Sequence, residues 1–245
     1  ENQGDNSTAN NVWDGAILLT KYLEMFPEKI RNKHILELGS GTGLVGISSF
    51  LLGASNVVTT DLPCALPLMK HNIERNCVTT SSNNNDEDDN VEKKEKKCID
   101  CAACDWFDPP PIQSFGFSSS LVSTFCSHEE LERECKSLSS SASLPLHQPD
   151  VILVADCVWL EELVVPLLDT LNRYTTTTCN DTKEDNDNEE EDNNHDSHHQ
   201  NETKQLSSSS STKIIMTYQQ RGKATHDLFW NKLHSMFHVQ EIDTC

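Results

Sequence analysis

The sequence predicts an α/β fold built on a doubly wound, mostly parallel sheet. Short apolar runs alternate with stretches whose apolar residues recur every three or four positions, the pattern of strands separated by helices. Strands joined through helices run parallel, with crossovers of one hand. Acidic residues follow the second and fourth of these runs, at the edge where parallel sheets bind ligands. A chain of 245 residues is long enough for one such domain, which we assign to residues 1–245.

The strands and helices follow from these patterns in order. Six apolar runs are predicted as strands: His34–Leu38, Val57–Thr60, Cys98–Cys104, Val151–Ala155, Lys213–Tyr218 and His238–Ile242. Five amphipathic stretches are predicted as helices: Val12–Glu24, Thr42–Leu52, Leu66–Asn76, Leu163–Tyr174 and Thr225–Phe237.

Three low-complexity segments interrupt the alternation. They span residues 79–97, 109–149 and 175–212, and are rich in Ser, Asn, Pro or charged residues. Such compositions bury too little apolar surface to offset the entropy of the chain, so we predict disordered insertions between elements. Within the second segment, SHEELERECKSL (residues 127–138) has the pattern of a short helix.

The composition narrows the function. A net charge of −20 argues against non-specific binding to nucleic acid or to an anionic membrane. No apolar run approaches the roughly 18 residues needed to span a bilayer. The ten cysteines lack a disulfide-like spacing, so we expect reduced thiols in a cytoplasmic protein, with a nuclear location also compatible. Because the first residue is Glu1, we expect the chain to be part of a longer one.

The stretch ILELGSGTGLVGI (residues 35–47) joins the first strand to a helix through three alternate glycines, Gly39, Gly41 and Gly43. Such a turn lets a nucleotide approach the backbone. Two ligand classes fit. GTGLVG, from Gly41 onward, formally satisfies the dinucleotide pattern. The pattern E-x-G-x-G-x-G, which starts at Glu37, resembles motif I of seven-strand S-adenosylmethionine-dependent methyltransferases. Asp61, at the end of the second strand, can accept both ribose hydroxyls in either case. A glycine-rich turn without a ligand is the third alternative.

Four stretches narrow this choice by their resemblance to a known family. They are VWDGAILLTKYLE, the segment of residues 35–76, CDWFD and DVILVADCVWLEELVVPLLDTL. In this order they resemble the protein-lysine methyltransferases of methyltransferase family sixteen, which are Rossmann-like enzymes with a seven-strand sheet. The resemblance covers nearly all of the chain outside the insertions. It implies that the last, antiparallel strand lies beyond Cys245.

The resemblance also implies roles in binding S-adenosyl-L-methionine. Trp13 would lie near the methionine end of the cofactor, and Asp61 would bind the ribose. Asp105 and Trp106 would lie beside the adenine. The remaining cofactor residues are in or near the sheet: Glu37, Gly39, Ser40, Gly41, Gly43 and Ala155. Trp13 and Trp106 have an alternative role as aromatic residues that only cover the core.

Asp156 and Trp159 are the candidate catalytic residues. The family has an Asp-x-x-Tyr motif after the fourth strand, and this chain reads Asp-Cys-Val-Trp. The resemblance assigns Asp156 to substrate orientation. Trp159 can wall the amine channel and attract an ammonium group, but it cannot accept a hydrogen bond as a phenolic oxygen would. A helix N-cap is the alternative role for Asp156.

Two further groups of side chains are considered as parts of a functional site. Gln219, Gln220 and Arg221 follow the fifth strand, where they could reach the substrate, but solvated loop polarity is the preferred interpretation. Cys98, Cys101 and Cys104 have a zinc-like spacing, yet a strand would point Cys101 and Cys104 to opposite faces. We therefore predict no metal site.

The sequence thus predicts a monomeric enzyme that methylates a lysine amine of a protein substrate, with chaperones and translation elongation factors as the expected classes. A small-molecule N-methyltransferase is the alternative, because Trp159 departs from the family motif. A non-catalytic binding module that keeps the fold is a third hypothesis.

Overall fold

A computed structural model describes residues 8–77, 97–116, 148–176 and 211–242. These residues form a five-stranded, wholly parallel sheet with the order β3-β2-β1-β4-β5. The strands are β1 (His34–Leu38), β2 (Asn56–Asp61), β3 (Cys98–Ala103), β4 (Val151–Ala155) and β5 (Lys213–Thr217). The predicted doubly wound parallel fold is therefore confirmed.

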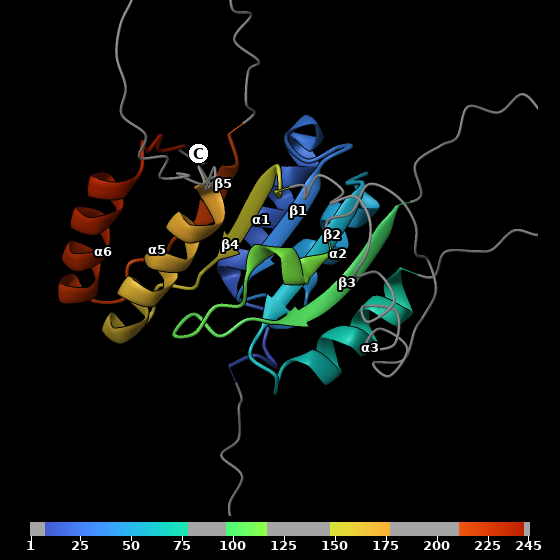
Figure 1. The fold of residues 1–245 in the computed structure, drawn as a ribbon, viewed down its shortest axis with the longest axis horizontal. Helices are drawn as coiled ribbons and strands as arrows, with labels where there is room; N and C mark the ends of the chain where they lie inside the picture. Colours follow the sequence, from blue (N-terminus) through green and yellow to red (C-terminus); the bar gives the residue numbers. More distant parts are fainter. Residues whose placement is uncertain (1–7, 78–96, 117–147, 177–210, 243–245) are drawn as a thin grey trace, which may run out of the picture.

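Helices cover both faces of the sheet. They are α1 (Asp14–Met25), α2 (Leu44–Leu51), α3 (Leu66–Asn76), α5 (Glu161–Thr175) and α6 (Lys223–Met236). On one face, Leu19 and Leu23 of α1 and Val45 of α2 pack on odd-numbered strand residues such as Ile35 and Leu153. Figure 1 shows α5 and α6 side by side, and their side chains form the core on the other face.

The central strands explain this two-sided packing. In β1 only His34 is partly exposed, and in β4 only Ala155. Successive side chains of a strand point to opposite faces, so a continuous apolar run buries both faces at once. Leu36 and Leu38 accordingly pack toward α5, whereas Ile35 packs toward α1.

The chain reverses its direction of winding between β1 and β4. β1, β2 and β3 are laid down toward one edge, and β4 then returns to the other side of β1 before β5 extends the sheet. The crossover helices on either side of this point leave a crevice at the carboxyl ends of the strands, where open α/β sheets bind ligands. The topology thus places a site beside Leu38 and Ala155.

The structure differs from the sequence predictions at two places. Residues 238–242, predicted as a sixth strand, are irregular, because a strand needs a partner edge and no described strand pairs with them. The second predicted insertion begins with structure: Ile112–Phe115 is a 3₁₀ helix. Phe115 is buried there and makes an edge-on contact with Tyr174, with ring centroids 5.7 Å apart. The remaining insertions, and the helix pattern of residues 127–138, lie almost wholly outside the described residues.

Candidate active site

A cleft of about 310 Å³ opens at the carboxyl ends of β1 and β4. Eleven of the twelve predicted site residues line it: Trp13, Glu37, Gly39, Ser40, Gly41, Asp61, Asp105, Trp106, Ala155, Asp156 and Trp159. Gly43 is the exception. It begins α2 as the N-cap residue, and a side chain there would meet Met69 rather than the cleft.

The glycine turn between β1 and α2 needs its glycines for two reasons. Gly39 and Gly41 have φ angles of +67° and +52°, in the left-handed region that L-residues with side chains disfavour. A Cβ on Gly39 would also lie 2.5 Å from Cys157 Sγ and 3.0 Å from the Trp106 ring. The turn therefore presents bare backbone to the cleft.

Asp61 closes the turn from the end of β2. Its Oδ2 accepts a hydrogen bond of 2.7 Å from the Gly41 amide, and its Oδ1 accepts one of 2.7 Å from the Leu62 amide. Burial raises the pKa of Asp61, although these two amides oppose the effect. A carboxylate has about four acceptor positions, so both oxygens keep capacity for further donors such as hydroxyls.

Glu37 forms the floor of the cleft. Its side chain is buried, and its Oε2 accepts a hydrogen bond of 2.9 Å from the Gly46 amide near the start of α2. Burial raises the pKa of Glu37 to about 8, against the lowering effect of hydrogen bonds from Ser40 and Gly46. Glu37 thus holds α2 onto the sheet as well as bordering the cleft.

Asp105 and Trp106 lie on the loop that follows β3. Asp105 accepts a hydrogen bond of 3.0 Å from the Phe107 amide, which shapes the loop as a tight turn. The Trp106 ring is half-buried and packs against the core below α5, while its edge reaches the cleft beside Gly39. Trp106 therefore covers the core, which is the alternative role, and it also lines the cleft, where the adenine-binding role remains a prediction.

Asp156 follows β4 in a left-handed conformation, with φ +55°. Its side chain is 1% exposed, and its Oδ2 lies 2.6 Å from Nη2 of Arg221 in an ion pair. The N-cap alternative for Asp156 is not realised, because Leu160 is the N-cap residue of α5 and no side chain caps that helix. A Cβ on Gly15 would lie 2.6 Å from Asp156 Cβ, so α1 touches this loop directly.

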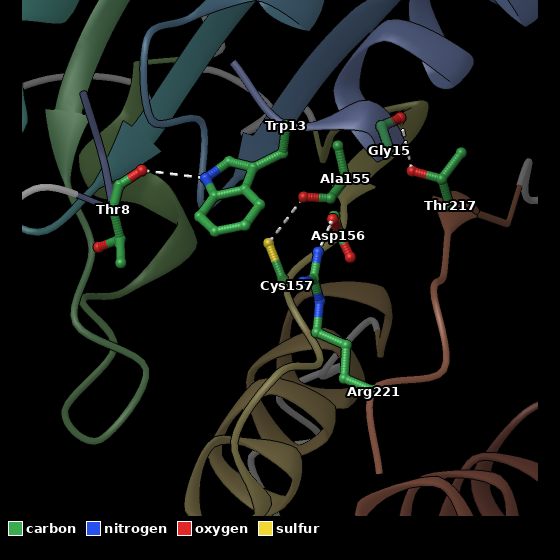
Figure 2. A network of polar contacts seen from close by, with 8 residues as sticks. All are labelled: Thr8, Trp13, Gly15, Ala155, Asp156, Cys157, Thr217 and Arg221. Atoms are coloured by element: carbon green, nitrogen blue, oxygen red, sulfur yellow. Dashed lines mark hydrogen bonds and ion pairs between the residues drawn. The ribbon is translucent and has the colours of Figure 1, made fainter. Parts of the chain in front are cut away.

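Trp13 and Arg221 complete this end of the cleft. Figure 2 shows the Arg221 side chain reaching from the loop after β5 to Asp156, beside the Trp13 indole. The guanidinium carbon lies 5.0 Å from the centroid of that ring. Trp13 donates a hydrogen bond of 3.0 Å to the Thr8 carbonyl oxygen, so its ring is fixed at the rim rather than buried in the core.

Arg221 is exposed, like Gln219 and Gln220, but its guanidinium also forms an ion pair with Asp156, which the interpretation as solvated loop polarity did not include. Sequence reasoning also gave no role to Cys157, whose thiol fills the space behind Gly39 and contacts the Leu38 and Gly39 carbonyl oxygens. Burial raises the pKa of this thiol. The only sequence feature that could have indicated a role for Cys157 is its position directly after Asp156.

The described residues contain no helix long and apolar enough to cross a membrane. Within the same residues, no group of three or more His, Cys, Asp or Glu side chains is arranged to hold a metal ion.

The cleft fits the adenosyl group of a nucleotide cofactor. Gly39 and Gly41 leave their backbone open, and Asp61 offers a carboxylate at the end of β2, the position from which ribose hydroxyls are bound in this fold class. Trp13 and Trp106 supply aromatic surface to the lining. A parallel sheet with such a cleft at the carboxyl ends of its central strands is the arrangement in which Rossmann-like proteins bind nucleotides.

Comparison with known proteins finds matches over part of the chain. Residues 1–105 match the family described as lysine methyltransferase, so the resemblance is confirmed. The chain is 51% identical over 65 residues to mouse "Protein N-lysine methyltransferase METTL21A", a match that covers 26% of this chain and 29% of the relative. It is 44% identical over 68 residues to mouse "EEF1A lysine methyltransferase 3", covering 28% and 29%. The chain thus spans less than a third of the length of these curated relatives.

A likeness to solved structures is also found. The crystal structure of protein arginine methyltransferase 10 from Arabidopsis thaliana aligns with 68% of this chain and 37% of its own, at 14% identity and a TM-score of 0.36.

Proposed function

We propose that this protein is an S-adenosyl-L-methionine-dependent methyltransferase that acts on a lysine amine of a protein. The observation that carries the proposal is the pairing of two features in one cleft. At one end lies a glycine turn with Asp61, which suits an adenosyl group. At the other end lies the buried Asp156 carboxylate beside an aromatic ring, which suits a cationic or amine group.

The cofactor would be held mostly by backbone and by Asp61. Gly39, Ser40 and Gly41 would contact it through main-chain atoms, and Asp61 would accept hydrogen bonds from the ribose hydroxyls. Trp106 and Asp105 would border the adenine. Trp13 and Ala155 would lie at the methionine end. Glu37 and Gly43 would act indirectly, since Glu37 binds the Gly46 amide and Gly43 shapes the start of α2.

Methyl transfer requires that the amine be aligned with the methyl group of the cofactor and that the amine be neutral. S-adenosylmethionine supplies a methyl group on a sulfonium, and a neutral thioether leaves, so no acid is required. A lysine ammonium with a pKa of about 10.4 must first lose a proton. Asp156 would orient the amine by accepting its hydrogen bonds. Desolvation of the bound lysine favours the neutral amine, and it has to outweigh the attraction of the Asp156 carboxylate for the ammonium form. Trp159, 43% exposed on the cleft wall, would guide the lysine side chain.

We infer a protein substrate of the elongation-factor or chaperone class. The name of one relative states that it is a lysine methyltransferase of EEF1A, and this makes elongation factor 1A the first substrate to test. A cytoplasmic monomer that binds neither nucleic acid nor membrane remains our expectation, and the net charge of −20 is compatible with it.

The test is methyl transfer from labelled S-adenosylmethionine, first to purified elongation factor 1A and then to a cell lysate. Two variants, Asp156→Asn and Gly41→Arg, remove the acceptor carboxylate and fill the cofactor turn. Asp169→Asn, an exposed acid of α5, is the matched control. We expect methyl-lysine with wild type and the control only. Label confined to small molecules would instead support the alternative N-methyltransferase. A folded chain that does not bind the cofactor would overturn the enzyme proposal.

A further inference from the structure

Arg221 occupies a position with the properties of a cation-binding site. Its guanidinium lies between the Asp156 carboxylate, at 2.6 Å, and the face of the Trp13 indole, at 5.0 Å from the ring centroid. An anionic oxygen on one side and the negative face of an aromatic ring on the other are the two features that attract an ammonium or guanidinium group. These groups come from three separate parts of the chain, as Figure 2 shows.

While Arg221 is paired with it, the Asp156 carboxylate is not accessible to another cation. Its side chain is 1% exposed, and its Oδ1 is buried without a hydrogen-bond partner in the described part of the chain. A buried carboxylate without a counter-charge is strongly unfavourable. Arg221 supplies this counter-charge, and it also blocks the approach of a substrate amine to Asp156.

Arg221 is the member of the cluster that can move. Its side chain is 33% exposed and belongs to the loop between β5 and α6, whereas Asp156 is fixed between β4, Gly15 and Thr217. Its stem is long enough to carry the charge into solvent at little cost, since a guanidinium is well solvated there. Departure of Arg221 would uncover both the carboxylate and the indole face.

We propose that Arg221 is an internal occupant of the substrate-cation site, and that the ammonium group of the target lysine exchanges with it. The exchange replaces one positive charge by another, so Asp156 stays compensated while Arg221 leaves and the ammonium group enters. An uncharged side chain offers no such replacement and leaves Arg221 in place. Arg221 is thus a specificity-determining residue that reserves the site for cations. The identity of the incoming cation as the target lysine rests on the proposed function, but the exchange itself does not.

The test measures cation binding without cofactor or methyl transfer. The probe is n-butylammonium, which has the shape and charge of a lysine side chain, and the readouts are the thermal midpoint Tm and the Trp fluorescence. In Arg221→Ala the site is empty, so we expect a saturable rise in Tm of a few degrees with the probe and a matching fluorescence change. Wild type and Lys223→Ala, which removes an exposed cation two residues away, should respond at much higher probe concentration only.

A double variant separates folding from binding. Asp156→Asn together with Arg221→Ala removes both charges, so it should fold without the probe and show no saturable response. If Arg221→Ala alone is unfolded, the proposal requires n-butylammonium to restore its folded signal. A folded Arg221→Ala protein without a saturable response, or equal responses from wild type and this variant, would overturn the exchange. Neither result depends on whether the protein transfers methyl groups.

Discussion

The Gly41 amide donates a 2.7 Å hydrogen bond to the Asp61 carboxylate, and this bond ties the end of β2 to the turn after β1. The bond fixes the direction of both groups before any ligand arrives. An acceptor that is already oriented binds its ligand with less loss of conformational freedom. We therefore expect Asp61 to have two roles, one in the structure of the turn and one in binding the ligand. Mutation of Asp61 can measure the two roles separately.

Asp61→Ala should weaken binding of S-adenosylhomocysteine, the reaction product, more than it weakens the fold. Hydrogen bonds to a charged group contribute about 1.5–3 kcal/mol, so we expect a roughly ten- to hundredfold higher Kd by calorimetry. Asp61→Asn, which keeps the shape and one acceptor oxygen, should fall between wild type and Ala. Unchanged affinity in both variants would show that Asp61 does not touch the ligand.

Stability should decline as the pH rises from about 4.5 to about 8. Burial raises the pKa of Glu37 from 4.5 to about 8, so across this window the folded protein holds a proton that the unfolded chain has released. Each pH unit then costs at most about 1.4 kcal/mol, and the full cost is present above pH 8. The raised pKa of Asp61 acts in the same direction.

Glu37→Gln is the variant that tests this pH dependence. Urea denaturation at several pH values should give a flatter profile for Glu37→Gln than for wild type. Glu162→Gln, a change at an exposed acid of α5, should keep the wild-type slope. Identical profiles for Glu37→Gln and wild type would contradict the assignment.

Gly46→Ala should destabilise the protein by about 1–3 kcal/mol, the usual cost of overpacking. A Cβ at this helical position would lie 2.1 Å from Thr59 Cγ2 and 2.7 Å from Glu37 Oε2. Gly222→Ala is the matched control, since the nearest atom to its Cβ is 3.9 Å away and its φ of −157° is open to any residue. Urea denaturation should show the full loss for Gly46→Ala and a smaller one, below about 1 kcal/mol, for the control, which exchanges glycine for alanine at the N-cap of α6.

Tyr174→Phe should loosen the loop that carries the start of the second predicted insertion. The Tyr174 hydroxyl donates a 2.7 Å hydrogen bond to the Pro110 carbonyl oxygen, and its ring packs on Phe115. Phe keeps the packing and leaves that carbonyl without its donor, at a cost of about 1 kcal/mol. Hydrogen exchange should become faster in residues 109–116, while β1 and β4 keep their protection. Uniform faster exchange over the whole sheet would contradict a local role.

The elements predicted best from sequence are those with the strongest local pattern. The bounds of β1, α3 and β4 agree residue for residue, because the two strands are buried apolar runs and α3 is a clear amphipathic helix with Pro67 in its first turn. The cleft follows from the same patterns, since the ends of parallel strands and a glycine turn mark it directly. The prediction of a strand at His238–Ile242 was wrong. A pattern of alternating apolar residues does not by itself provide the neighbouring strand with which a strand must pair.

The contacts that sequence reasoning missed are all long-range. Arg221 and Asp156 are 65 positions apart, and nothing near Arg221 distinguishes it from a solvated loop residue. Phe115 lies in a segment rich in Ser and Pro, where its packing on Tyr174 leaves no local trace. The glycine pattern likewise could not tell that Gly43 faces Met69 whereas Gly39 and Gly41 face the cleft.

The closeness of Gly15 to Asp156 has a consequence for how the sequence can evolve. A side chain at position 15 would collide with Asp156, and Asp156 itself sits at a φ of +55° that few residues tolerate. Mutations at the two positions are thus not independent: position 15 can gain a side chain only in a lineage whose position 156 has already become glycine, because any other residue there keeps the Cβ that the new side chain would meet. Such a descendant would have lost the carboxylate, and a side chain acquired at position 15 would then prevent Asp156 from returning.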